Sequence, residues 1–344
     1  MSDTTGAGKG AVLVTGGAGY IGAHTCKALA AAGWTPVVFD SLSGGYIQAV
    51  QWGPFVHGDV RDSQALKDAL VQHECRAVIH FAGLIEVGRS VVRPDLFFDH
   101  NTFGTAALLR AMREAGATRL IFSSTAAVYG MPANGGGLNG GAPISEDDPK
   151  APINPYGDSK LAAERMIHAA GRAYGITGVA LRYFNACGAD PEGRIGEAHH
   201  PETHLIPLAL EAAISGGKPL TVFGDDFETP DGSCLRDYIH VDDLAAAHVA
   251  ALEAELEVGT FHAFNVGVGR GFSVFEVLRA VEAATGAPVP HSVGPRREGD
   301  PPVLVADSAR LQTTLGWRPA HTDLVDVVRT AANWRKAPRY GPWA

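Results

Sequence analysis

Val12-Leu13-Val14-Thr15-Gly16-Gly17-Ala18-Gly19-Tyr20-Ile21-Gly22 is the stretch that decides the fold. Its first four residues are apolar or β-branched and indicate a short buried strand. Three glycines follow with the spacing G-x-x-G-x-x-G, and a helical pattern then runs over 20–32. Such glycines permit a tight turn, close approach of the backbone to a pyrophosphate, and close packing of helix on strand. The stretch predicts a dinucleotide-binding turn with the phosphates at the N-terminus of the helix.

The next predicted strand, 36–39, ends at an acidic residue. Asp40 lies 18 residues after Gly22, close to the ~20 residues expected for a carboxylate that binds the adenosine ribose. Because a carboxylate there repels a 2′-phosphate, the cofactor is expected to be NAD and not NADP. The alternative interpretation of Asp40 is an ordinary turn residue at the end of a strand.

Composition narrows the class of protein. A chain of 344 residues, 46% of them hydrophobic, is long enough for one large α/β unit and a smaller lobe. The net charge of -9 argues against nucleic acid and anionic membranes as partners. No run reaches the ~20 apolar residues of a membrane span, and no signal-peptide pattern opens the chain. Four scattered cysteines without a C-x-x-C pair favour reduced thiols in a cytoplasmic protein.

From Ala11 onward, strand and helix patterns alternate as in a doubly wound parallel sheet. We therefore expect an α/β protein with a parallel Rossmann sheet and a smaller C-terminal substrate-binding lobe. The strand candidates are 12–15, 36–39, 55–57, 77–81, 119–123 and 178–183, and the helix candidates are 20–32, 63–73, 95–116 and 155–174.

After about Tyr183 this rhythm changes, and proline- and glycine-rich turns separate shorter elements. We expect helices at 205–216, 242–254, 273–285 and 307–315 and strands near 219–223 and 261–266. The predicted organisation is an NAD-binding domain at 11–182 plus 236–266, a substrate lobe at 183–235 plus 267–338, a disordered tail at 1–10 and a flexible loop tip at 134–141.

Asn154-Pro155-Tyr156-Gly157-Asp158-Ser159-Lys160 is the stretch expected to carry the chemistry. Asn154 suits a helix N-cap and Pro155 the first helical position, so Tyr156 and Lys160 lie at i and i+4 on one face. A neighbouring ammonium and the helix N-terminus favour the phenolate of a tyrosine, whose usual pKa is about 10. The alternative is an unrelated surface aromatic and a solvated lysine.

The predicted strand at 119–123 ends in hydroxyl side chains, where ligands bind in a parallel α/β sheet. Thr125 is the candidate for a hydrogen bond to the reacting oxygen of the substrate, with Ser123 and Ser124 beside it. The alternative is a Ser/Thr-rich strand end with no function.

These motifs together resemble the extended short-chain dehydrogenase/reductase family. Longer blocks, in order over about 12–317, resemble specifically the UDP-glucose (UDP-galactose) 4-epimerases of that family. The blocks are His80-Phe81-Ala82-Gly83, Leu181-Arg182-Tyr183-Phe184-Asn185, Thr229-Pro230-Asp231-Gly232, Arg236-Asp237-Tyr238-Ile239-His240-Val241 and Arg296-Arg297-Glu298-Gly299-Asp300.

The resemblance implies interconversion of UDP-glucose and UDP-galactose. The phenolate of Tyr156 would take the proton of the 4-hydroxyl while hydride passes from C4 to NAD, and the 4-keto sugar would turn and receive the hydride on its other face. Alternatives are a 4-epimerase of UDP-GlcNAc, UDP-xylose or UDP-glucuronate, or an NAD-binding sensor without catalysis. A homodimer with a seam of helices 95–116 and 155–174 is also implied.

By this resemblance, three sets of residues form the site. The catalytic set is Tyr156, Lys160 and Thr125. The cofactor set is Gly16, Gly19, Tyr20, Ile21, Gly22, Asp40, Asp59, Val60, Phe81, Ala82, Gly83, Asn101, Ser123, Tyr156, Lys160 and Tyr183. The substrate set is Thr125, Tyr156, Asn185, His204, Leu205, Thr221, Phe223, Arg236, Arg297, Asp300 and Leu304.

The chain also departs from the family pattern. Ala126-Ala127 replaces the acidic residues of related dehydratases, which argues against elimination of water. Glu86 stands where a lysine is common, so either Arg89 or Lys160 compensates or the affinity for the pyrophosphate is lower. His204 replaces the usual amide. Leu304 replaces a tyrosine that crowds the C2 substituent, so UDP-N-acetylhexosamines are expected as further substrates.

One other cluster resembles a metal site. It comprises Glu197, His199, His200, Glu202 and His204. Prolines flank these residues and no helix period aligns them, so we expect a loop and no metal.

Overall fold

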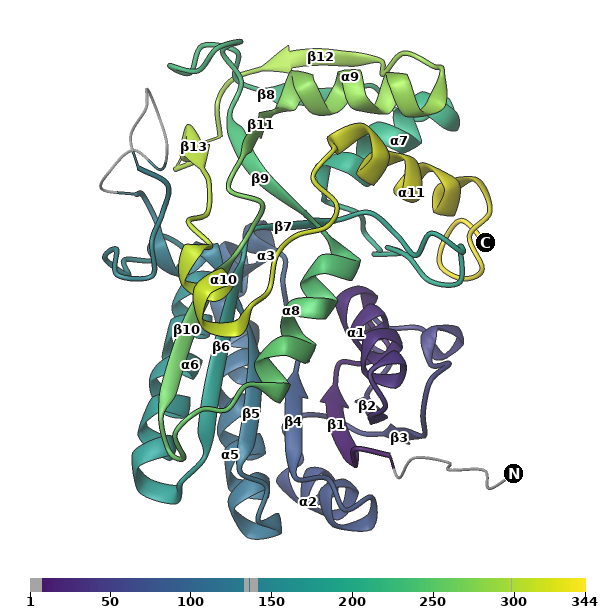
Figure 1. Cartoon of the computed structure of the whole chain (residues 1–344). Helices are drawn as coiled ribbons and strands as arrows, with labels where there is room; N and C mark the ends of the chain where they lie inside the picture. The colour runs from purple at the N-terminus through teal and green to yellow at the C-terminus, as the bar shows by residue number, and fades with distance from the viewer. Residues whose placement is uncertain (1–7, 133–135, 137–141, 298) are drawn as a thin grey trace.

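Seven parallel strands form the large sheet of the computed structural model, which describes residues 8–132, 136, 142–297 and 299–344 (Figure 1). Their order is β3-β2-β1-β4-β5-β6-β10, and each neighbouring pair is parallel. This order confirms the predicted doubly wound sheet. The strands are β1 Ala11–Thr15, β2 Thr35–Asp40, β3 Phe55–His57, β4 Ala77–His80, β5 Arg119–Thr125, β6 Thr177–Tyr183 and β10 Phe261–Val266.

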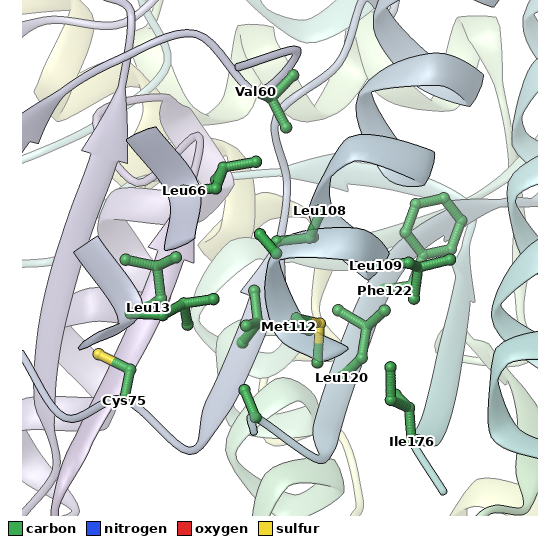
Figure 2. Close-up of a cluster of buried hydrophobic side chains, with 14 of the residues drawn as sticks. Leu13, Val60, Leu66, Cys75, Leu108, Leu109, Met112, Leu120, Phe122 and Ile176 are labelled. Atoms are coloured by element: carbon green, nitrogen blue, oxygen red, sulfur yellow. The ribbon is translucent and has the colours of Figure 1, made fainter. Parts of the chain in front are cut away.

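Helices cover both faces of this sheet. On one face lie α2 (Ser63–Gln72), α5 (Gly104–Ala115) and α6 (Pro155–Tyr174). Figure 2 shows the interlocked side chains beneath them, where Leu66 and Leu108 meet Leu13 and Leu120 of the strands. On the other face lie α1 (Tyr20–Ala31), α8 (Val241–Glu253) and α10 (Ala309–Leu315). Burial of a leucine of this kind stabilises the fold by about 1.5–3 kcal/mol.

A smaller lobe sits over the carboxyl ends of these strands (Figure 1). Its main sheet joins β7 (Asn185–Cys187), β9 (Leu235–His240), β11 (Gly271–Ser273) and β13 (Val303–Leu304), and a second pairs β8 (Leu220–Phe223) with β12 (His291–Gly294). The lobe's own core joins α7 (Leu205–Ile214), α9 (Val274–Thr285) and α11 (Leu324–Lys336). Ser273 and Glu276 form a capping box that fixes the start of α9.

Short helical segments bring further residues to the sheet edge. They are η1 (Ile47–Ala49), α3 (Val87–Val92), α4 (Pro94–Phe97), η2 (Phe98–Phe103) and η3 (Ala126–Tyr129). The helix predicted at 95–116 is present, but a π-helical segment, η2, interrupts it before α5 begins. Such π segments are frequent at functional sites because they redirect side chains.

Two predicted domain boundaries differ from the structure. The sequence predicts 236–266 in the cofactor domain, but β9 belongs to the lobe's sheet, and the chain returns to the large sheet only with α8. The sequence predicts the helix 307–315 in the lobe, yet Leu311 of α10 packs in the core of the large sheet. Both errors have one reason: an isolated strand or helix pattern does not say which sheet it joins.

Of the predicted tail 1–10, residues 1–7 lie outside the described residues. The backbone N–H of Lys9 donates to the carbonyl of Gly33, and the carbonyl of Gly10 accepts from the N–H of Thr35, so these residues extend the pairing of β1 with β2 and are ordered. The loop tip predicted at 134–141 also lies outside the described residues, apart from Gly136. Within the described ranges, no helix combines the length and apolar character needed to cross a membrane.

Candidate active site

The strand order places a crevice at one point of the large sheet. β1 has β2 on one side and β4 on the other, and both pairs are parallel. The order of the strands along the chain therefore reverses its direction across the sheet at β1. Ligands of open α/β sheets bind outside the carboxyl ends of the strands at such a switch point. The glycine turn follows β1 here, and Phe81 and Ala82 follow β4, with their N–H groups donating to the carbonyl of Thr15.

The glycines of this turn leave no room for a side chain. Gly16 has a φ of +73°, and a Cβ on it would lie 2.6 Å from the N atom of Ala82. A Cβ on Gly22 would lie 2.2 Å from the carbonyl oxygen of Gly16. Gly19 is the N-cap of α1, and no side chain of the described residues caps this helix end. The turn therefore presents backbone N–H groups, which suits a pyrophosphate.

Asp40 ends β2 beside this turn, as predicted. Its Oδ2 accepts a hydrogen bond from the N–H of Ala18 at 3.0 Å, and its Oδ1 accepts one from Leu42 at 2.8 Å. Burial raises the pKa of this carboxyl group, and the two backbone donors act in the opposite direction. The carboxylate thus supports the turn, and each oxygen has a further lone pair for a ribose hydroxyl.

Asp59 and Val60 have other contacts. Arg61 donates to both carboxylate oxygens of Asp59, at 2.9 and 2.6 Å, which lowers the pKa of Asp59 to about 2. Val60 is 7% exposed and packs in the core beneath α5. Asp59 is therefore held by Arg61, and its Oδ2, with one hydrogen bond, keeps a further lone pair for an adenine.

Tyr156 and Lys160 occupy the first turns of α6. Asn154 caps the helix by accepting from the N–H of Gly157 at 2.9 Å, and Pro155 is its first residue, as predicted. Tyr156 is 7% exposed and Lys160 3%. Their burial excludes the alternative of an unrelated surface aromatic and a solvated lysine.

The environment of the two side chains shifts both pKa values. Burial raises the pKa of the Tyr156 phenol, while hydrogen bonding with Thr125 acts in the opposite direction. Burial lowers the pKa of Lys160 to about 8, and nearby Glu164 acts against this. The Lys160 Nζ donates to the carbonyl of Ser123 at 2.9 Å and lies 4.9 Å from the ring centre of Phe122. A buried phenol and a buried lysine therefore lie one helical turn apart at the start of α6.

The end of β5 supplies the predicted hydroxyl groups. The Oγ1 of Thr125 accepts from the N–H of Ala127 at 3.1 Å, and its side chain reaches Tyr156. The Oγ of Ser123 is hydrogen-bonded to the hydroxyl of Tyr183. Thr125, Tyr156, Ser123 and Tyr183 therefore form one group at the carboxyl ends of β5 and β6.

Asn101 lies in the π segment η2 and is buried. Its Oδ1 accepts from the N–H of Leu84 at 2.8 Å, and its Nδ2 donates to the Oγ of Ser159 at 3.0 Å. A Cβ on Gly83 would lie 2.7 Å from this Oδ1. Asn101 thus ties the segment after β4 to helix α6, and joins the predicted cofactor and catalytic residues.

A second group lies on the lobe's sheet. Arg236 pairs with Asp300, and Leu304 lies beside Arg236 in the register of β13 with β9. The guanidinium carbon of Arg297 lies 3.9 Å from the ring centre of Phe223. Two arginines, an aspartate and an aromatic ring of the predicted substrate set are thereby arranged in two pairs.

Other predicted substrate residues stand apart from these pairs. The Nδ2 of Asn185 donates to the carbonyl of Asp237 at 3.0 Å. Thr221 is exposed on β8, and Leu205 packs against the lobe core. Glu86 pairs with Arg89 at 3.2 Å, so one of the two side chains expected to compensate for the missing lysine is held by the glutamate itself.

Residues 197–204 form a loop, as expected, but this loop brings four of the predicted side chains together. Donor atoms of Glu197, His199, Glu202 and His204 all lie within 4.8 Å of one another, and His200 lies outside the group. The loop folds back on itself before α7, and helical or strand periodicity carries no information on such a return. His204 is consequently engaged with Glu197 and Glu202.

Sequence reasoning missed a buried ion pair behind the site. Arg182 of β6 donates to both oxygens of Glu164 of α6, at 3.0 and 2.6 Å, and the Oγ of Ser124 also donates to Glu164. The two charged side chains are only 5% and 3% exposed. The pair fixes α6, and with it Lys160, against β5 and β6. The sequence offered only a charged residue inside a strand pattern and another inside a helix pattern.

Comparisons with known proteins agree with this geometry. A sequence model of the NAD dependent epimerase/dehydratase family matches residues 12–267. The UDP-glucose 4-epimerase of Halalkalibacterium halodurans is 48% identical over 331 residues, which cover 96% of this chain and 97% of the relative. The UDP-glucose 4-epimerase of Brucella ovis in complex with NAD superposes with a TM-score of 0.90 at 48% identity, covering 94% of this chain and 98% of that one.

A third relative was solved with a sugar nucleotide. The UDP-glucose 4-epimerase of Stenotrophomonas maltophila, with bound NAD and formylated UDP-arabinopyranose, superposes with a TM-score of 0.90 at 38% identity. The match covers 95% of this chain and 98% of that one. This chain is thus similar to these proteins over nearly its whole length.

Proposed function

Because this chain belongs to the NAD-dependent epimerase/dehydratase family, we propose that it interconverts UDP-glucose and UDP-galactose. The observation that carries the proposal is the pairing of Tyr156 and Lys160, both buried on the first turns of α6, with the glycine turn at the switch point of the same sheet. A base at this edge and a dinucleotide at that turn meet over one substrate carbon. The relatives named above carry the same activity in their names over matching lengths.

NAD fits the residues at the turn. The glycine turn forms a cradle of backbone atoms, in which a Cβ on Gly16 or Gly22 would fill the space. The uncapped start of α1 offers N–H groups to the pyrophosphate. We assign Asp40 to the adenosine ribose, and its negative charge disfavours a 2′-phosphate. Bound NAD would supply reversible hydride acceptance, so that the overall reaction involves no net oxidation.

Tyr156 acts as the general base in this proposal. Its phenolate would take the proton of the sugar 4-hydroxyl and return it after the 4-keto sugar has turned. Thr125, which already reaches the phenol, would hold the same hydroxyl in line. General acid–base catalysis of this kind contributes typically about 10²–10⁴-fold in rate.

Lys160 supports the base electrostatically. Its ammonium lies on the same helix face as Tyr156, and a nearby positive charge favours the phenolate. The carbonyl of Ser123 fixes the ammonium at 2.9 Å, so little reorganisation is needed when the phenolate forms. We also assign Lys160 to the nicotinamide ribose, because its further N–H donors remain for a hydroxyl.

The lobe would hold the UDP moiety. Arg236 and Arg297 offer planar guanidinium groups that match pyrophosphate oxygens, and Phe223 offers an exposed ring for the uracil. UDP held by side chains of the lobe leaves the hexose free to present either face. We extend the proposal to UDP-N-acetylhexosamines, because Leu304 lies beside Arg236 without the bulk of a tyrosine.

The test is direct. The purified chain is incubated without added NAD with UDP-galactose, UDP-glucose, UDP-GlcNAc and UDP-xylose, and the products are separated chromatographically. We expect UDP-galactose and UDP-glucose to reach the same final mixture from either side. Release of tightly bound NAD on denaturation, with no turnover of any UDP-sugar, would contradict the proposal and favour a non-catalytic NAD-binding sensor.

We further propose a cytoplasmic homodimer. All four cysteines are free, as in reducing compartments. Beside α6, α3 and η2 expose Val91 (63%), Val92 (77%) and Phe103 (64%), and apolar side chains exposed in this number favour a protein partner. Light scattering is expected to give twice the chain mass of 36.0 kDa, and a monomer would contradict this part of the proposal.

A further inference from the structure

A compact group of nitrogen and oxygen donors lies in the loop between β7 and α7. The Nδ1 of His204 lies 2.8 Å from Oε1 of Glu197 and 3.1 Å from Oε1 of Glu202. The Nδ1 of His199 lies 3.0 Å from the same Oε1 of Glu197, and the two imidazole rings are 5.1 Å apart. One donor from each of the four residues lies within 4.8 Å of every other.

A separate observation indicates a missing ligand in this group. The side chain of Glu202 is only 4% exposed. Its Oε1 accepts from the N–H groups of Thr203 and His204 at 2.7 and 2.8 Å. Its Oε2 is buried and has no hydrogen-bond partner among the described residues. A carboxylate oxygen without a partner is costly to bury, and a bound cation removes this cost.

The donor types select the ion. Two imidazoles and two carboxylates suit Zn²⁺, whereas Mg²⁺ and Ca²⁺ prefer oxygen ligands alone. With bonds of about 2.0–2.1 Å, the donors around a tetrahedral zinc lie roughly 3.3 Å apart. The pairs at 2.8–3.1 Å already have about this spacing, and no pair of the four donor atoms is more than 4.8 Å apart.

We propose that Glu197, His199, Glu202 and His204 form a Zn²⁺ site of structural type. Four protein ligands leave no open coordination position, which is typical of structural and not of catalytic zinc.

The surroundings of the group indicate what a zinc ion there would hold together. The indole Nε1 of Trp334 in α11 donates to the carbonyl of Glu197 at 2.9 Å. The ring of Tyr20, at the start of α1, lies edge-on to His199 at 6.2 Å. His204 is the N-cap residue of α7. Zinc would therefore fix the loop between the helix that receives the dinucleotide phosphates and the helix that opens with the predicted uridine contact.

The experiment uses the full chain with its bound NAD, purified without a polyhistidine tag, treated with chelator and titrated with ZnCl₂. We expect one zinc per chain by calorimetry and elemental analysis, and a rise in the melting temperature of several degrees at saturating zinc. Replacement of zinc by Co²⁺ is expected to give the visible absorption of a tetrahedral site. Mg²⁺ is expected to bind the unaltered chain no more tightly than it binds the variants described next.

Two variants and a matched control test the assignment. Glu202→Gln keeps the shape of the side chain, and His204→Asn removes an imidazole; each is expected to weaken zinc binding at least tenfold and to abolish the thermal shift. His200→Asn alters the neighbouring exposed histidine outside the group and is expected to leave zinc affinity unchanged.

Two results would overturn the proposal. One is the absence of stoichiometric zinc binding by the unaltered chain. The other is zinc binding that Glu202→Gln leaves intact while His200→Asn weakens it. Retention of NAD reports whether each variant is folded, and Glu202→Gln decides the matter if His204→Asn does not fold.

Discussion

The two halves of the proposed site are built in opposite ways. The cradle at β1 and β4 consists of backbone atoms, and Gly16 and Gly22 approach their neighbours so closely that no Cβ fits. The lobe edge consists of long side chains: Arg236 pairs with Asp300, and Arg297 stacks on Phe223, which is 36% exposed. A backbone cradle either accepts its ligand or fails, whereas a side-chain surface changes its affinity by degrees. Substitutions in the cradle are therefore expected to have larger effects than substitutions at the lobe edge.

The largest effect is expected for Gly22→Ala. The new Cβ would lie 2.2 Å from the carbonyl oxygen of Gly16, a backbone atom that cannot move without opening the turn. We expect loss of bound NAD, loss of activity and a decrease in the free energy of unfolding of about 3 kcal/mol or more. Denaturation with urea and the NAD content of the purified protein measure both.

A matched control for this variant is Gly44→Ala. A Cβ on Gly44 meets nothing within 4 Å, so stability and NAD content should stay close to those of the unaltered chain. Equal behaviour of the two variants would contradict the interpretation of the turn as a backbone cradle.

Tyr156→Phe should act on the chemistry and leave the cradle intact. Loss of the phenolic oxygen is expected to lower kcat by about 10²–10⁴-fold, with NAD content and melting temperature nearly unchanged. Tyr174→Phe, at the exposed end of the same helix, is the control. Full activity of Tyr156→Phe would reject this tyrosine as the base.

The pH dependence should separate Lys160 from the lobe arginines. Burial lowers the pKa of Lys160 to about 8, below its usual 10.5, so the ammonium is present below pH 8 and is lost above it. Burial also raises the pKa of the Tyr156 phenol, so the phenolate–ammonium pair has one proton fewer than the phenol–ammonium pair that prevails below pH 8. We therefore expect kcat to rise with pH by up to about tenfold per unit and to level off above about pH 8, while KM, assigned to the lobe, changes little. A kcat that is level from pH 6 to pH 10 would contradict the assignment of these two groups.

The lowered pKa of Lys160 also makes the free energy of unfolding depend on pH. Between about pH 8 and pH 10.5 the unfolded state binds a proton at Lys160 that the folded state does not, so this residue makes the free energy of unfolding rise with pH. Lys160→Met should remove this component, and it should stabilise the NAD-free protein at pH 7 by up to about 3 kcal/mol while lowering kcat. Denaturation of both proteins at pH 7 and pH 10 measures it, and an equal difference at the two values would contradict the assignment.

At the lobe edge we expect a graded effect. Arg236→Lys keeps the charge but loses the planar fork, so KM for UDP-galactose should rise about 10–100-fold with little change in kcat. Arg279→Lys, at an exposed arginine of the same lobe, should leave KM unchanged. A decrease confined to kcat would place Arg236 in the chemistry instead of in UDP binding.

The smallest effect is expected at Leu304. This residue packs beside Val128, Tyr129, Ile144 and Leu161, next to Arg236 in the strand register. Leu304→Tyr should lower kcat/KM for UDP-GlcNAc about tenfold and leave that for UDP-galactose within about twofold. Negligible turnover of UDP-GlcNAc by the unaltered chain would end the hypothesis of a wide sugar pocket.

The same contrast explains what the sequence could predict. The cradle, the strand before it and the cap of α6 are local patterns, each contained in about ten residues, and the structure has them where they were predicted. The lobe was predicted through resemblance, since the pairs Arg236–Asp300 and Arg297–Phe223 join residues far apart in the chain.

The misses have the same origin. The sheet to which β9 belongs, the face on which α10 packs and the return of the loop around Glu197 all depend on contacts between distant segments. The buried pair of Arg182 and Glu164 is a similar case, because neither residue differs by pattern from a solvated charge. The periodicity of a sequence predicts which face of a helix or strand is buried, but it does not predict which distant residues contact that face.

The path of the chain has a consequence for its synthesis. The chain leaves the large sheet after β6, returns with α8 and β10, leaves again for β11, and comes back with α10, whose Leu311 closes the core on one face (Figure 1). A ribosome that has released only the first half has therefore supplied neither the last strand of that sheet nor the helix that shields it. Apolar strand surface stays exposed until translation is almost complete, so chaperone contact during synthesis should concentrate on this face.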